Sequence, residues 1–183
     1  MQPAARRAIE VPTIETERLR LRAYRKEDFS TCIEMWTDPI VNRYTSGKPL
    51  TSEETWTKTM RNAGMWVVLG YGFWALEEKA SGKFIGELGF ADFGRAIDPP
   101  LTGMPEMGWV LMPYAHGKGY ATEATRAAMA WGDQYFGPVR MVCLIQVGND
   151  ASVRIAHKLG FQEMTRTMYK EHEVMILTRE PRA

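Results

Sequence analysis

The sequence of 183 residues contains few of the residue types that build disulfide frameworks and metal sites. Its two cysteines, Cys32 and Cys143, fall in apolar patterns, where a lone thiol is usually a reduced core residue. Its three histidines, His116, His157 and His172, do not have the spacing of metal ligands, so we expect no metal site. Because reduced thiols are typical of proteins inside the cell, the cytoplasm is the expected location.

Long apolar segments and a dominant charge are also missing. The longest uncharged apolar run, residues 65–76, spans twelve residues, which is too short to cross a bilayer. The formal net charge is +1, so we expect neither nucleic acid nor a membrane surface as a partner. Residues 1–13 contain no apolar stretch of a signal peptide. We therefore expect them to form a loose leader before a single domain at residues 14–183.

Regular patterns of apolar residues indicate the secondary structure. Alternation at residues 18–22 predicts a strand with one buried face, and a Thr-x-x-Glu capping box at Thr51 predicts a helix that ends near Gly64. Further strands are expected at residues 66–69, 72–77, 84–93, 106–112, 139–147, 164–169 and 174–178. Further helices are expected at residues 29–36, 120–135 and 149–158. This succession indicates one α/β domain, in which helices flank a mixed sheet.

One segment, residues 106–124, combines an apolar strand, a glycine-bearing turn and the first turn of a helix. Such a junction leaves several main-chain N–H groups unpaired at the positive end of a helix dipole, so it predicts an anion site, above all for phosphate. Two common phosphate loops do not fit. A Walker A loop would need glycine at Met112 and Ser or Thr at Gly119, and a dinucleotide loop would need glycine at Thr122.

The sequence from His116 to Ala121 resembles the [Gln/Arg]-x-x-Gly-x-[Gly/Ala] acyl-CoA loop of the GNAT superfamily of N-acetyltransferases, with His116 in place of the leading Gln or Arg. Further segments are similar to that family, in its order, and favour the branch of the ribosomal-protein-alanine acetyltransferases: residues 15–22, 86–89, 106–109, 149–154 and 158–161. The resemblance covers about residues 14–180. It implies the GNAT fold, a mixed α/β fold in which about four helices flank a twisted, mostly antiparallel sheet of six or seven strands.

The resemblance also implies how acetyl-CoA binds. Main-chain amides of the loop are expected to hold its pyrophosphate, and they belong to Gly117, Lys118, Gly119, Tyr120, Ala121 and Thr122. The Lys118 ammonium contacts a phosphate or is solvated, and the His116 ring adds a pH-sensitive contact or faces solvent; both questions are open. The strand at 106–112 is expected to pair with the pantetheine arm, with the Val110 amide donating to the thioester carbonyl and Met112 facing the arm.

Acyl transfer to an amine needs a base for the amine and a proton for the departing thiolate. By resemblance Glu106 is the candidate base, with a structural ion pair to a nearby arginine as its alternative, and Glu87 is a weaker candidate. Ser152 matches a serine proposed as the acid, and its alternative is a place in the first turn of a helix. Many relatives have a catalytic tyrosine where this sequence has Ala156, so that mechanism is absent. Asn149 is expected to contact pantetheine or to cap the helix that follows.

Two functions follow from the resemblance. The first is an N-acetyltransferase that moves an acetyl group from acetyl-CoA to a primary amine by direct attack in a ternary complex, where the amine is a protein N-terminus or part of a small molecule. The alternative is a domain that binds or senses acyl-CoA without catalysis. The only expected partners are acetyl-CoA, the amine acceptor and, as an open alternative to the monomer, a second copy in a homodimer.

Overall fold

The computed structural model describes residues 10–181, so residues 1–9 of the predicted leader lie outside the described part. Within this part, eight strands form one sheet: β1 (Ile14–Glu15), β2 (Leu19–Arg22), β3 (Phe73–Glu78), β4 (Lys83–Ala91), β5 (Glu106–Leu111), β6 (Met141–Gln146), β7 (Gln162–Tyr169) and β8 (His172–Arg179). Five α-helices accompany them: α1 (Asp28–Thr37), α2 (Pro39–Asn42), α3 (Ser52–Leu69), α4 (Tyr120–Phe136) and α5 (Asp150–Lys158). None of these helices is long and apolar enough to cross a membrane.

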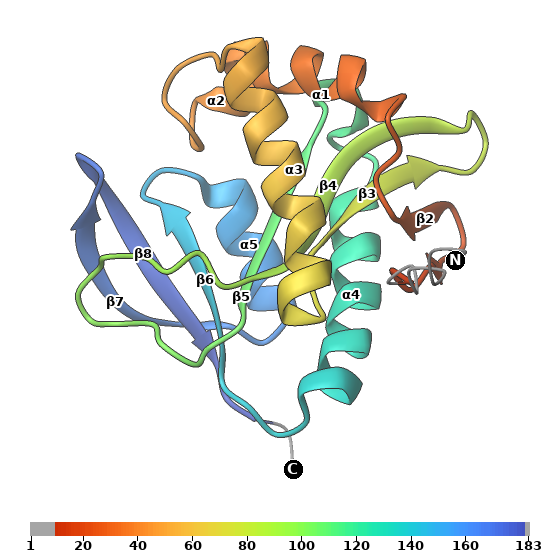
Figure 1. The fold of residues 1–183 in the computed structure, drawn as a ribbon. Helices are drawn as coiled ribbons and strands as arrows, with labels where there is room; N and C mark the ends of the chain where they lie inside the picture. Colours follow the sequence, from red (N-terminus) through yellow and green to blue (C-terminus); the bar gives the residue numbers. More distant parts are fainter. Residues whose placement is uncertain (1–9, 182–183) are drawn as a thin grey trace, which may run out of the picture.

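The strands are ordered β1-β2-β3-β4-β5-β6-β8-β7, and every neighbouring pair is antiparallel except β5 and β6. Successive side chains of a strand point to opposite faces of a sheet. Ala75 of β3 packs in a cluster with α1, whereas its neighbour Trp74 packs in the main core with residues of α4. The sheet therefore lies between α1 and α3, which pack on each other, and α4 (Figure 1).

The fold class predicted from the sequence is confirmed, with two additional short elements. The sheet has eight strands rather than six or seven because β1 has only two residues, too few for alternation to reveal. The helix α2 has four residues, and the Asp38 side chain caps it by accepting hydrogen bonds from its first amides. At the end of the predicted leader, the Pro12 carbonyl accepts a hydrogen bond from the Trp74 indole (2.8 Å).

The predicted strand at residues 66–69 is wrong, because α3 continues through these residues instead of ending near Gly64. Trp66 is 3% exposed on this helix, and its indole N–H donates to the Phe73 carbonyl (2.9 Å). Gly70, with a φ of 78°, then ends the helix in the left-handed conformation. The composition of residues 66–69 fits both a strand and a helix. The segment is helical in the structure, and the helix buries Trp66.

The capping box at the start of α3 is present and gives a test of local stability. The Glu54 amide donates to Thr51 Oγ1 (3.1 Å), and the Thr51 amide donates to Glu54 Oε2 (2.8 Å). We expect Thr51→Ala to lower the free energy of unfolding by about 1 kcal/mol, measured by urea denaturation. Thr57→Ala is the control, since Thr57 is exposed in the same helix and caps nothing. Equal effects of the two substitutions would show that the box does not stabilise the helix.

Candidate active site

The parallel neighbours β5 and β6 pair at one position only, Glu106 with Val142, and then diverge. In contrast, β5 pairs with β4 along its whole length. The Val142 amide donates to the Pro105 carbonyl (3.1 Å), which fixes the side of β5 that faces β6. Because main-chain groups alternate in direction along a strand, every second amide of β5 points into the gap between the two strands. Met107 lies at the paired end, where its amide faces the Val142 carbonyl, so the amides that open into the gap belong to Trp109 and Leu111.

The same alternation turns the Val110 amide away from the gap and toward β4. On that side, the Met112 amide donates to the Ile85 carbonyl (2.9 Å), and Val110 is paired with Glu87 two residues earlier. The predicted direction of the Val110 amide is therefore wrong: it faces β4 and not the gap, since a shift of one position reverses the direction of the main-chain groups. Met112 is 6% exposed and packs with α1, so it lies in the core rather than facing the gap as predicted.

The glycine loop follows β5 at the gap's open end and leads directly into α4. Gly117 and Gly119 have φ values of 73° and 79°, which favour glycine, and they turn the chain so that α4 begins at Tyr120. In the part of the chain that the structure describes, no protein acceptor bonds the main-chain N–H groups of residues 117–122. The 17-residue helix α4 adds its positive dipole end at this point. The loop therefore offers a row of free donors to an anion.

Two side chains of the loop hold its conformation. The His116 Nε2 donates to the Leu111 carbonyl (2.9 Å), which can only accept, and so ties the loop to the end of β5. The Tyr120 hydroxyl donates to Glu78 Oε1 (2.6 Å), so it is already engaged, whereas the Tyr120 amide is unpaired. The Lys118 side chain is exposed, and its ammonium lies 5.7 Å from the centroid of the Tyr120 ring. Its predicted contact with a phosphate stays a prediction.

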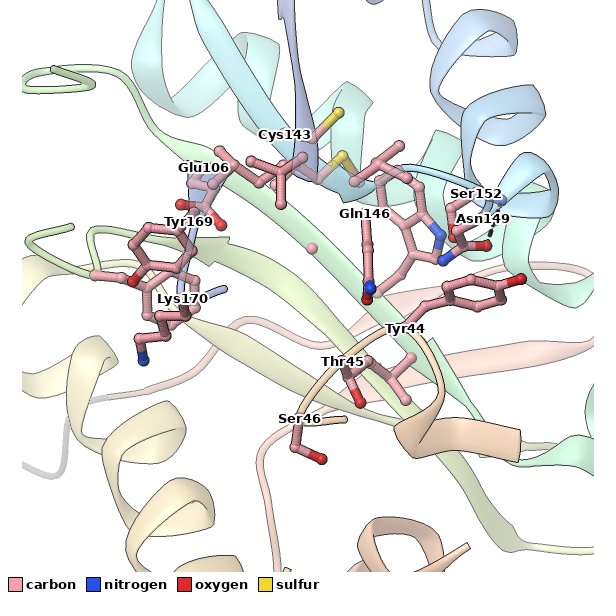
Figure 2. Close-up of a pocket in the computed structure, with 18 of the residues that line it drawn as sticks. Tyr44, Thr45, Ser46, Glu106, Cys143, Gln146, Asn149, Ser152, Tyr169 and Lys170 are labelled. Carbon is pink, nitrogen blue, oxygen red and sulfur yellow. Dashed lines mark hydrogen bonds between the residues drawn. The ribbon is translucent and has the colours of Figure 1, made fainter. Parts of the chain in front are cut away.

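A cleft of about 410 Å³ opens over the β5–β6 gap, between α3, the loop at residues 94–105 and the β7–β8 hairpin. Figure 2 shows its two sides. Glu106, Tyr169 and Lys170 lie on one side, and Asn149 and Ser152 lie on the other. The structure therefore brings the predicted base and the predicted acid to a single cleft, although 46 positions separate them in the sequence.

Glu106 forms an ion pair with Arg95 of the loop at residues 94–105. Arg95 Nε donates to Glu106 Oε2 (2.6 Å), and Arg95 Nη2 donates to Oε1 (2.7 Å). Burial opposes the charge of Arg95, but the hydrogen bonds to Glu106 raise the pKa of its guanidinium above the ordinary value. The structural alternative for Glu106, an ion pair with a nearby arginine, is thus confirmed, and both of its oxygens are engaged. Its role as base stays a prediction.

Glu87 is the second carboxylate of the cleft, and it is 1% exposed. The Tyr24 hydroxyl donates to Glu87 Oε2 (2.9 Å), and Asn62 Nδ2 donates to Oε1 (3.0 Å). Burial and the charge of Glu87 raise the pKa of Tyr24 well above its ordinary value, so the phenol remains a neutral donor. Among residues 10–181, no lysine or arginine forms an ion pair with Glu87. No local pattern indicates these contacts, because they come from α3 and from the segment before α1.

Asn149 and Ser152 lie together at the start of α5. Asn149 Oδ1 accepts a hydrogen bond from the Ser152 amide (3.3 Å), as the dashed line in Figure 2 marks. The predicted capping role of Asn149 is confirmed, and so is the place of Ser152 in the first turn of the helix. The Asn149 Nδ2 and the Ser152 hydroxyl form no hydrogen bond within the described part, so both are free for a ligand.

The two cysteines are unsuited to covalent catalysis. Burial, followed by the charge of Glu87, raises the pKa of Cys32 to about 12. Burial likewise raises the pKa of Cys143, which lines the cleft. Neither thiol therefore ionises near neutral pH. No group of three or more His, Cys, Asp or Glu side chains in the described residues is arranged to hold a metal ion.

Comparison with known proteins agrees with this geometry. A family model for the acetyltransferase (GNAT) domain matches residues 18–162. The uncharacterised protein YkkB of Bacillus subtilis is 33% identical over 150 residues, which cover 79% of this chain and 82% of that protein. The uncharacterised N-acetyltransferase p20 of Bacillus licheniformis is 27% identical over 152 residues, which cover 82% of this chain and 83% of that protein.

Solved structures share the fold along nearly the whole chain. A protein of Bordetella pertussis assigned to the GnaT family of acetyltransferases has a TM-score of 0.82 and 28% identity, with 92% of this chain and 99% of that chain covered. RimL, a ribosomal L7/L12 alpha-N-protein acetyltransferase in complex with coenzyme A, has a TM-score of 0.71 and 19% identity, with 93% and 98% covered. At that identity the second likeness shows the fold alone.

Proposed function

Because this chain belongs to the GNAT acetyltransferase family, we propose that it transfers the acetyl group of acetyl-CoA to a primary amine. The proposal rests on two sets of main-chain donors that lie one after the other, along the β5–β6 gap and in the glycine loop at its end. The gap beside β5 presents free amides, and the loop at its end presents the unpaired N–H groups of residues 117–122. A long ligand with an anionic end and an amide-bearing arm fits this arrangement, and CoA has both.

In the proposed complex, the loop amides hold the pyrophosphate and the pantetheine arm lies in the gap as an additional strand. The Leu111 amide binds the arm, and the Trp109 amide, one repeat further along β5, donates to the thioester carbonyl. The same donor stabilises the oxyanion that forms when the amine attacks, an effect worth about 3 kcal/mol. Asn149 contributes its free Nδ2 to the arm from the opposite side of the gap.

The chemistry is a direct displacement. The neutral amine attacks the thioester carbonyl, a C–N bond forms, and the C–S bond breaks as the tetrahedral intermediate collapses. One proton leaves the amine nitrogen for a base, and one proton reaches the CoA thiolate from the Ser152 hydroxyl or from a water that it orients. The base then releases its proton to water and the donor regains one from water, so the reaction neither consumes nor produces a proton. The buried, protonated cysteines support a ternary complex without an acyl-enzyme.

The contacts favour Glu87 over Glu106 as the group that receives the amine proton. Arg95 donates to both oxygens of Glu106, so neither oxygen is free to receive the amine proton. The hydrogen-bond donors to Glu87 are neutral and leave part of its oxygens open to the cleft, and Glu87 is paired across the strands with Val110, next to the Trp109 amide. Glu106 lies three residues before Trp109, or about 10 Å along the strand. A water between Glu87 and the amine completes the transfer.

The proposal is tested by following the release of free thiol from acetyl-CoA with a panel of amines and peptides, with product masses determined in parallel. We expect thiol release that depends on an amine and gives a product heavier by one acetyl group. Heat-denatured protein is the control for uncatalysed aminolysis. Tight binding of CoA with no acetylated amine would favour the alternative, a domain that senses acyl-CoA.

A further inference from the structure

Four cations line the cleft, and an aromatic ring lies against each of them. We call them the cationic mouth: Lys58 and Arg61 of α3, Arg95 of the loop at residues 94–105, and Lys170 at the tip of the β7–β8 hairpin. The Lys58 ammonium lies 4.1 Å from the Trp36 ring centroid. The Arg61 and Arg95 guanidiniums lie 4.9 and 4.7 Å from the Phe93 ring. The Tyr169 ring has Arg95 at 5.0 Å and Lys170 at 5.6 Å.

Protein carboxylates compensate the positive charge of the mouth only in part. Arg95 and Glu106 neutralise each other. Within residues 10–181, Lys58, Arg61 and Lys170 form no ion pair. Lys58 and Arg61 interact electrostatically with Glu87, the cleft carboxylate that forms no ion pair, and Lys170 has no carboxylate partner in the described residues. Burial, opposed by Glu87 and reinforced by neighbouring cations, lowers the pKa of Lys58, which is the response of a charge that lacks a partner.

Arg95, which is paired with Glu106, and Lys170 lie too far from the glycine loop to serve the pyrophosphate of CoA. Glu106 and Leu111 mark the two ends of β5, about 16 Å apart, and the loop continues beyond Leu111. Figure 2 shows Lys170 on the same side of the cleft as Glu106, away from Asn149 and Ser152. In the proposed complex the thioester lies between these ends. The charges of the mouth therefore face the acceptor.

We propose that the acceptor is a primary amine that also carries an anionic group, a carboxylate or a phosphate, which Lys58, Arg61 and Lys170 bind. This inference rests on the proposed function and narrows its substrate class. The two groups of such an acceptor then match two parts of the cleft. Its anionic group binds the cationic mouth, and its amine reaches Glu87 and the thioester. The aromatic rings restrict the long side chains of the cations before the acceptor arrives, so less conformational entropy is lost on binding.

The test compares matched acceptors by kcat/KM in the thiol-release assay. The pairs are glutamic acid α-amide with glutamine α-amide, a Ser-Glu-Glu peptide with Ser-Gln-Gln, and phosphoethanolamine with ethanolamine. We expect the anionic member of at least one pair to be preferred tenfold or more, with the preference falling as salt rises. The pair with the larger preference shows whether the mouth binds a carboxylate or a phosphate. Equal rates within twofold in every pair would overturn the inference while leaving amine acetylation in place.

Substitutions in the cationic mouth test which residues cause the preference for the anionic acceptor. We expect Arg61→Gln and Lys170→Met each to reduce kcat/KM about tenfold for the anionic acceptor, with less than a twofold change for the neutral one and for CoA affinity. Both side chains are exposed, so folding is preserved, and Lys83→Met is the control for loss of an exposed lysine outside the cleft. Arg61→Glu should reverse the preference. An unchanged preference in all three mouth variants would refute the assignment, and failure to acetylate any amine would refute both proposals.

Discussion

Replacing Gly119 by aspartate is expected to weaken CoA binding by roughly a hundredfold to a thousandfold while the protein stays folded. A Cβ at this position would meet only Arg18 Nη2 at 3.5 Å, an ordinary contact, and aspartate is among the residues that tolerate the left-handed conformation. The new carboxylate would lie next to the pyrophosphate. Two such charges about 4 Å apart repel by roughly 4 kcal/mol at an effective dielectric constant of 20. Isothermal titration calorimetry with CoA measures the effect.

Gly103→Asp is the matched control for this prediction. Gly103 has a φ of 80°, a Cβ added to it would have nothing within 4 Å, and it belongs to the loop before β5, at the far end of that strand from the glycine loop. Gly103→Asp introduces the same charge at a residue with the same backbone conformation, but far from the proposed pyrophosphate site. The CoA affinity should therefore stay within about twofold of wild type. Wild-type affinity in Gly119→Asp would remove the loop from the binding site. Equal losses in both variants would point to backbone strain instead.

The second large effect is expected at the carboxylates of the cleft. Glu87→Gln should lower kcat roughly a hundredfold near pH 7, because the amide keeps the shape of the side chain but accepts no proton. The loss should be largest below pH 8, where a terminal amine is mostly protonated, and should shrink at higher pH as the neutral amine becomes abundant. Pre-steady-state thiol release across pH 6 to 9 measures the chemical step.

Glu106→Gln is the internal comparison, since Glu106 is also buried in the cleft. We expect a loss of less than tenfold with a flat ratio to wild type across pH, because the substitution breaks the ion pair with Arg95 rather than a proton transfer. The reverse ranking, with the large and pH-dependent loss in Glu106→Gln, would return the role of base to Glu106, as the family resemblance implies.

Local signals are enough to predict the glycine loop and most of the fold. The residues that turn the chain at Gly117 and Gly119, the helix that follows and the capping box at Thr51 depend on neighbours within a few positions. Position along a strand is harder to predict. Alternation shows that residues 106–112 form a strand, but the direction of each amide depends on hydrogen bonds to β4 and β6. The sequence therefore does not reveal that the Val110 amide faces β4 while the Trp109 amide faces the gap.

Contacts between distant segments could not be read from the sequence. The pairing of Glu106 with Arg95 depends on how the loop at residues 94–105 folds back over β5. The hydrogen bonds to the buried Glu87 carboxylate come from Tyr24 and Asn62, which lie in two other parts of the chain. The cationic mouth likewise joins α3, this loop and the β7–β8 hairpin. None of these segments carries a motif that would indicate its neighbours.

The most direct measurement of the central claim is a ¹⁵N–¹H correlation spectrum of the protein, recorded during a titration with CoA. If CoA lies along β5 with its pyrophosphate on the loop, the amide signals of residues 117–122, Trp109 and Leu111 should shift the most, with Val110 moving less than its two neighbours. If those signals stay in place while the largest shifts fall elsewhere, the loop and the gap do not form the CoA site, and the assignment of every catalytic role fails with it.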